Sequence, residues 1–237
     1  MGDAARSVLA RLKNKAKESG RSYQLCLQLF CQEEFLRRLE KSKYVDNLVL
    51  KGGLFIYSLT EFDSRVTVDV DFLLKRIPNT SEQLRKVVEE IIVVETGNGF
   101  AGPVINTYSI ETTVAEKIDA ILSLMEFSSR MKDYYDIYYL SHKFDFEGEV
   151  LCEALSKTFT NREHNFTIEQ FKQNMTFDSD DGMQKKWKAF TKKIDVEMEV
   201  FSMILHSINA FLLEPYTAVI NGTIFEKQWA ANQGGWN

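Results

Sequence analysis

Two aspartates separated by one residue are the side chains of this sequence best placed to do chemistry. Asp69 and Asp71 lie in a short apolar run, residues 66–74, whose composition predicts a β-strand. Side chains alternate between the two faces of a strand, so both carboxylates are expected to point the same way. Divalent metal ions would neutralise the paired charges and hold phosphate groups. A strand edge with both acids in water is the alternative interpretation.

A glycine pair precedes this run. Lys51-Gly52-Gly53 follows an apolar segment and leads into a second apolar segment, residues 54–59, with the pattern of a helix. Glycine lets the backbone come close to a ligand, and a turn at the start of a helix suits phosphate. Alone, the pair is an ordinary turn. Together with Asp69 and Asp71 it favours a site for a metal and a nucleotide.

Two more charged residues lie on predicted helices. Lys117 is in line with the apolar positions of its helix, so its ammonium either reaches a phosphate at the rim of a cleft or ends a stem that covers the core. Asp133 has three interpretations. It is an acid favoured in the first turn of a helix, a partner for Lys117 or Arg65, or a group that helps to ready an acceptor hydroxyl.

Periodicity predicts a small α/β unit flanked by helices on both sides. A helix is expected over residues 4–42 and another over 82–90, with a second strand over 91–94. After Pro103 the pattern is almost entirely helical. Thr113 and Glu116 are expected to form a capping box that opens a helix over 114–125. Further helices are expected over residues 131–140, 149–159, 168–175 and 183–213.

Composition limits the function further. The 237 residues include no run of 18 apolar residues and no apolar N-terminal segment, which predicts a cytoplasmic protein without a membrane span. The three cysteines lack metal-ligand spacing and are expected to be reduced. No Walker loop or Gly-x-Ser-x-Gly motif supports a P-loop enzyme or a serine hydrolase.

Net charge is −5, but basic residues cluster near the N-terminus and again over residues 185–193, where Trp187 and Phe190 interrupt five lysines. Each cluster is either a surface for a phosphate backbone or a solvated helix face.

The chain resembles the AbiEii/AbiGii nucleotidyltransferase toxins of AbiE-type toxin–antitoxin systems. The resemblance rests on four ordered motifs and on a helical lead-in over residues 7–44. The motifs are VLKGGL at 49–54, RVTVDVDF at 65–72, TVAEK at 113–117 and RMKDYYDI at 130–137.

The resemblance implies an α+β fold with a DNA-polymerase-β-like core, whose small, reduced sheet is flanked by N- and C-terminal helices. Residues 1–108 would hold the N-terminal helices and the palm, and 109–237 a mainly helical region. Asp69 and Asp71 would hold two Mg²⁺ ions. The nucleotide would meet five residues: Lys51, Gly52, Gly53, Arg65 and Lys117. Asp69, Asp71, Lys117 and Asp133 would form the catalytic set.

The implied reaction transfers a nucleotide from an NTP to an acceptor such as tRNA. It would arrest growth in phage defence, opposed by a cognate antitoxin of the winged-helix repressor type. One departure from the family is a short stretch between the predicted helix at 82–90 and the TVAEK motif. Glu95 is the only obvious third acid there. The alternative is therefore a shortened, catalytically weak or inactive member that acts by binding a partner or a nucleotide.

Overall fold

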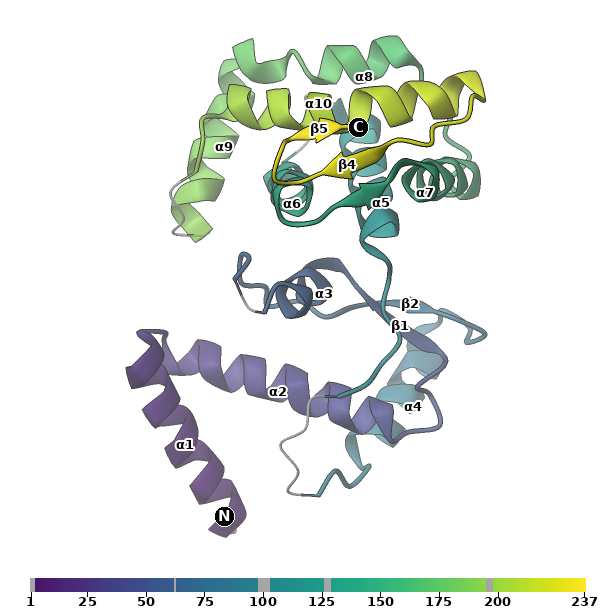
Figure 1. Ribbon diagram of the computed structural model, residues 1–237. Coiled ribbons are helices and arrows are strands. Elements are labelled where there is room, and N and C mark those ends of the chain that lie inside the picture. The colour runs from purple at the N-terminus through teal and green to yellow at the C-terminus, as the bar shows by residue number, and fades with distance from the viewer. Residues whose placement is uncertain (1–2, 62, 98–102, 126–128, 195–197) are drawn as a thin grey trace. The chain divides into compact units, whose positions relative to one another are not determined.

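Helices dominate the structure, and the small sheets that accompany them are antiparallel. The computed structural model describes residues 3–61, 63–97, 103–125, 129–194 and 198–237. The chain divides into two compact units, Met1–Tyr108 and Ser109–Asn237 (Figure 1). Each unit has its own small sheet and its own helices. The fold is α+β, as the resemblance implied.

The sheet of the first unit brings the glycine turn beside the aspartate pair. Strand β1 (Leu48–Lys51) pairs antiparallel with β2 (Asp71–Leu74), with Lys51 opposite Asp71. On the other side of β1 the chain runs parallel at Thr107, where Leu50 N donates to Asn106 O at 2.8 Å. The sheet is therefore as small as expected.

The strand predicted over 66–74 forms only in its second half. Residues 65–70 form no regular secondary structure, and one reason lies in α2 (Tyr23–Glu40). The side-chain amides of Gln28 and Gln32 donate to the carbonyl of Val68 at 3.1 and 2.9 Å. That acceptor is therefore used by side chains instead of a neighbouring strand.

Two helix predictions in this unit need correction. The helix predicted over 4–42 is interrupted between α1 (Asp3–Ser19) and α2, because Gly20 has φ +67° and Ser22 caps the second helix by accepting from Leu25 N. The strand predicted over 91–94 is wrong. Ile91 belongs to α4 (Ser81–Ile92), where it is buried four residues after Val87 on one helical face. Helix α3 (Gly52–Leu59) follows β1 directly.

The second unit is built from helices around a three-stranded sheet that the sequence did not predict. Its order is β3-β4-β5, and Trp229 pairs with both Phe146 and Trp236. The elements are α5 (Ile110–Leu124), α6 (Met131–Lys143), β3 (Phe146–Glu147), α7 (Gly148–Asn161), α8 (Ile168–Asn174), a short 3₁₀ helix (Phe177–Ser179), α9 (Asp181–Ile194), α10 (Phe201–Asn221), β4 (Gln228–Ala230) and β5 (Gly235–Trp236).

Two further predictions fail at helix ends in this unit. Helix α5 begins earlier than expected, because Ser109 caps it by accepting from Thr112 N, and Thr113 instead donates back to Ser109 O. The long helix predicted over 183–213 is two helices, α9 and α10.

Helix α10 supplies much of the core of the second unit. Its length and composition alone would allow it to cross a membrane, and it is the one helix of the described residues that meets this test. Many of its large side chains are buried, however, among them Phe211 and Tyr216, and it packs on α6 and α7. A core helix explains these contacts.

Candidate functional site

The glycine turn and the aspartate strand are in direct contact. Gly52 has φ +70°, and a Cβ atom built on it would lie 2.2 Å from Asp71 Oδ2. A Cβ on Gly53 would lie 2.9 Å from Thr67 Oγ1. A real Cβ cannot approach this closely, so residue 52 must be glycine for both its backbone angle and its space. The turn therefore presents backbone beside a carboxylate.

The same turn begins a helix whose first amides lack a side-chain cap. Lys51 is the N-cap residue of α3, and its side chain makes no capping hydrogen bond. Its Nζ instead lies 3.5 Å from Tyr108 Oη and 4.9 Å from the centre of that ring. The first turn of a helix offers N–H donors and the positive end of the dipole, which suit phosphate oxygens.

Asp69 and Asp71 are both exposed, whereas Val70 and Phe72 are half-buried and Phe72 contacts the ring of Phe35. This agrees with the predicted alternation. Val68 departs from it, with 57% of its surface exposed. Within the described parts of the chain, neither carboxylate has a hydrogen bond or an ion pair. Two accessible oxygen donors beside a backbone turn fit a Mg²⁺ ion that keeps several water and phosphate ligands.

Glu95 does not complete this pair. No three His, Cys, Asp or Glu side chains among the described residues come together as a metal site. The strand that was expected to carry Glu95 to the sheet does not form, because its first residues are the end of α4. The next residue, Thr96, is held on α2, where its carbonyl accepts from Lys41 and its hydroxyl donates to Glu34 at 2.7 Å. Arg65, also expected at the nucleotide, is half-buried in the segment before Thr67.

Lys117 and Asp133 meet in the second unit. Lys117 Nζ lies 3.1 Å from Asp133 Oδ1 and 2.6 Å from Asp136 Oδ2. All three side chains are buried, and Arg130 also donates to Asp133. Of the pairings considered for Asp133, the structure contains the one with Lys117. Asp133 also occupies the first turn of α6, as the helix-dipole interpretation requires.

Burial also affects Tyr134, next to Asp133. Its hydroxyl has no hydrogen-bond partner among the described residues. Burial, and then the charge of Asp133, raise the pKa of this phenol well above its usual value. The hydroxyl is therefore protonated at neutral pH.

A second buried charge cluster was missed from the sequence. Asp119 is fully buried, and its two oxygens accept from Arg162 at 2.6 Å and meet His164 Nδ1 at 2.7 Å. Arg162 also reaches Glu116, at 3.4 Å. These contacts join α5 to the segment that directly follows α7. The position of Asp119 two residues after Lys117 was the only available signal, and it does not identify the partners.

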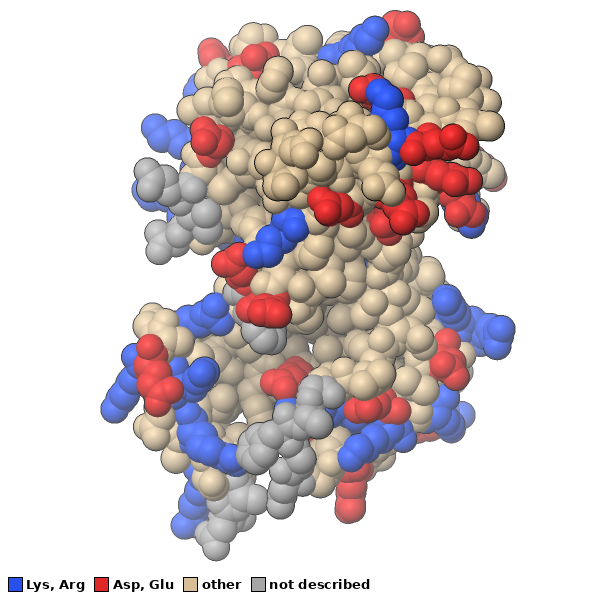
Figure 2. Space-filling model, in the orientation of Figure 1, with Lys and Arg blue, Asp and Glu red and all other residues tan. Residues whose placement is uncertain are grey.

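The two basic clusters have different surroundings. Lys and Arg side chains gather over α1 in Figure 2, where Arg6, Arg11, Lys13, Lys15 and Lys17 are exposed. In α9 the two aromatic residues contact rings of other elements in the same unit. Trp187 is buried, its ring centre lies 5.5 Å from that of Phe201, and its Nε1 donates to Glu199 O. The ring of Phe190 contacts the ring of Tyr135. Exposed lysines of α9 remain as a solvated face.

The chain matches a known protein family. The protein-family model described as "Nucleotidyl transferase AbiEii toxin, Type IV TA system" matches in two segments, residues 34–102 and 95–207. Together they cover more than half of the 237 residues. No curated protein and no solved structure matches the chain.

Proposed function

Because the chain belongs to the AbiEii family of nucleotidyl transferase toxins from type IV toxin–antitoxin systems, we propose that it transfers a nucleotide from an NTP to an acceptor in a Mg²⁺-dependent reaction. The observation that carries this proposal is the approach of the Gly52 backbone to Asp71, 2.2 Å from an ideal Cβ position to Oδ2. Backbone donors for phosphate and a carboxylate for Mg²⁺ stand side by side there. A nucleoside triphosphate with its metal requires both.

Each residue of the turn has a distinct role in this proposal. Asp69 and Asp71 hold two Mg²⁺ ions, and Gly52 and Gly53 present the first amides of α3 to the triphosphate. Lys51 adds positive charge at the N-cap of the same helix. Arg65, six residues before Asp71 at the start of the same motif, adds a second positive charge. Bound Mg²⁺ supplies neutralisation of the phosphates and activation of the acceptor hydroxyl.

Lys117 and Asp133 complete the catalytic set by the pattern of the family. Lys117 contacts the triphosphate, and Asp133 is an essential carboxylate. The ion pairs of Lys117 with Asp133 and Asp136, at 3.1 and 2.6 Å, support a fixed ammonium rather than a mobile one. A fixed cation loses little side-chain entropy when it meets a phosphate. Asp133 therefore acts as a positioning residue for Lys117.

The acceptor we propose is the 3′ end of a tRNA. The exposed basic side chains of α1 support a phosphate-backbone partner. A cognate antitoxin of the winged-helix repressor type would counteract the toxin. We propose that the toxin acts in the cytoplasm and serves in phage defence.

A shortened family member that only binds a partner or a nucleotide is the second candidate. Two observations favour it. The described residues contain no third acid beside Asp69 and Asp71. The family model also matches in two segments, which overlap at residues 95–102, instead of in one continuous stretch.

Controlled expression in bacterial cells separates the two candidates. We expect the wild-type chain to arrest growth and Asp69→Ala to permit it, with both proteins present at equal abundance. Sequencing of tRNA 3′ ends from arrested cells should find added nucleotides. Growth arrest by Asp69→Ala, or arrest without any change in RNA, would favour the binding protein over the transferase.

A further inference from the structure

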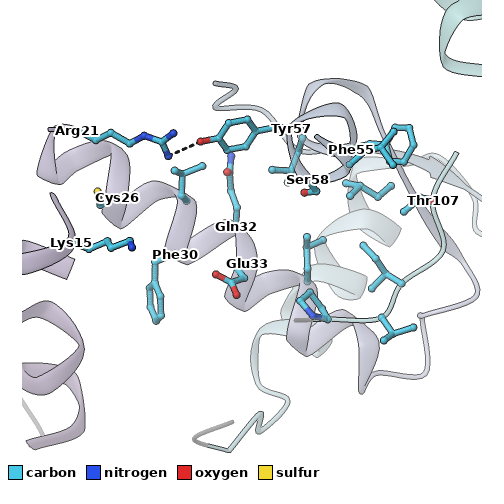
Figure 3. Close-up of a pocket in the computed structure, with 18 of the residues that line it drawn as sticks. Lys15, Arg21, Cys26, Phe30, Gln32, Glu33, Phe55, Tyr57, Ser58 and Thr107 are labelled. Carbon is cyan, nitrogen blue, oxygen red and sulfur yellow. Dashed lines mark hydrogen bonds between the residues drawn. The ribbon is translucent and has the colours of Figure 1, made fainter. Parts of the chain in front are cut away.

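A cavity of about 760 Å³ lies in the first unit, among α1, α2, α3 and the segment after Pro103 (Figure 3). Its wall is mostly apolar and includes Leu12 of α1, Leu29 and Leu36 of α2, and Leu54 of α3. A mostly apolar cavity of this size, with a few polar groups in its wall, is typical of small-molecule sites. Neither Asp69 nor Asp71 lines it.

One buried polar atom in this wall lacks a partner. Gln32 is only 7% exposed, and its Nε2 donates to Val68 O at 2.9 Å. Its Oε1 has no hydrogen-bond partner among the described residues. Figure 3 shows the side chain extending from α2 toward Tyr57. A buried acceptor without a donor is unfavourable, so a ligand that brings an N–H or O–H group to Gln32 would be stabilised.

Two cations in the lining favour a negative group on the same ligand. Arg21 Nη1 donates to Tyr57 Oη at 2.7 Å, and this contact, drawn as a dashed line in Figure 3, fixes the guanidinium. Lys15 of α1 is exposed. Among the described residues, neither cation has an ion pair with a carboxylate. Glu33 also lines the cavity, but Arg37 compensates its charge at 2.6 Å.

We propose that this cavity binds a small anionic amphiphile. Its apolar chain occupies the leucine-lined space, its N–H donates to Gln32 Oε1, and its carboxylate lies near Arg21 and Lys15. N-acyl amino acids combine these three features. The proposal does not depend on nucleotide transfer, because none of the residues assigned to the metal or the nucleotide lines the cavity.

Calorimetric titration of the full chain with two related amphiphiles tests the proposal. N-lauroylglycine has the chain, the amide N–H and the carboxylate, while N-lauroylsarcosine replaces that hydrogen by a methyl group. Both are used below the concentration at which they form micelles. We expect N-lauroylglycine to bind, and N-lauroylsarcosine to bind about fivefold to tenfold more weakly, the effect of one hydrogen bond to a buried acceptor. Equal affinities, or no binding of either compound, would overturn the proposal.

Substitutions in the cavity provide independent tests. Leu29 is half-buried, so Leu29→Trp should fold and should abolish binding by filling the space. Lys15→Met should weaken binding severalfold, whereas Lys17→Met, an exposed neighbour on α1 outside the cavity, should not change it. Gln32→Met should remove the difference between the two amphiphiles. Folding is checked by thermal unfolding of each variant. Unchanged binding by a folded Leu29→Trp would place the ligand elsewhere.

Discussion

Asp71 Oδ2 occupies the space into which any side chain on Gly52 would project, 2.2 Å from the ideal Cβ position. The two residues are 19 positions apart in the sequence, and the pairing of Lys51 with Asp71 brings them together. The pairing fixes the backbone of Asp71 beside the first turn of α3. The proposed metal and phosphate sites therefore depend on a hydrogen at this one position.

Substitution of Gly52 should impair both stability and transfer. Gly52→Ala places a Cβ at φ +70° and against Asp71. Gly97→Ala is a matched control, because Gly97 also has φ +70° but no atom within 4 Å of its ideal Cβ. Both should lose about 1–2 kcal/mol of unfolding free energy from the backbone angle. Urea denaturation should find a greater loss for Gly52→Ala, and only that variant should lose transfer. Equal losses in both variants would contradict the steric explanation.

Lys117 should matter for stability as well as for transfer. Lys117→Met leaves Asp133 and Asp136 buried with less compensation, which should cost about 3–5 kcal/mol of unfolding free energy. The double variant Lys117→Met, Asp136→Asn should recover part of this loss, because it removes the negative charge of one of the two buried carboxylates. Urea denaturation of the two single variants and the double variant measures the coupling. Additive losses would show that the pair is not coupled.

The expected loss of stability in Lys117→Met also determines how nucleotide transfer by this variant should be measured. A loss of transfer in Lys117→Met is informative only at a temperature at which the variant is folded. Near-complete folding, checked by circular dichroism, is therefore the control for that assay.

Alkaline pH should destabilise the protein through Cys152. Burial raises the pKa of this thiol from 9.0 to about 11, and its Sγ donates to Pro215 O. A raised folded-state pKa means that the contribution to stability is complete below about pH 9 and is lost as the pH rises toward about 11. The difference in unfolding free energy between wild type and Cys152→Ala should shrink across this range. Cys31→Ala, at an exposed position, is the control. A difference between wild type and Cys152→Ala that stays constant over this pH range would contradict the burial of the Cys152 thiol.

The local parts of the site could be predicted from the sequence, because they depend on neighbours in the chain. The glycine turn, the helix after it and the alternation around Val70 follow from residue type and period. The length of β2 could not, because Gln28 and Gln32, about forty positions away, take the carbonyl of Val68. Nor could the loss of the strand over 91–94, since Val87 and Ile91 fit a helix or a strand until packing decides.

The second unit illustrates the same limit. The position of Lys117 on the apolar side of its helix was predicted from periodicity, and Asp133 was one of its suggested partners. The participation of Asp136 and Arg130 required the packing of α5 on α6. The partners of Asp119 lie more than forty residues away, on other elements. The sheet that joins Phe146 to Trp229 connects segments still more distant. Contacts of this range have no signature in a single sequence.

Transfer of label from radioactive NTPs to total tRNA, with and without Mg²⁺, tests the proposed role of the aspartate pair most directly. Asp71→Asn removes one proposed metal ligand from an exposed position, so the variant should remain folded. Glu95→Gln is its control, because Glu95 is an exposed acid of the same unit that joins no metal cluster. We predict Mg²⁺-dependent labelling by wild type and Glu95→Gln, and its loss in Asp71→Asn. Undiminished labelling by Asp71→Asn, or none by the folded wild type, would contradict a metal-dependent transferase centred on Asp69 and Asp71.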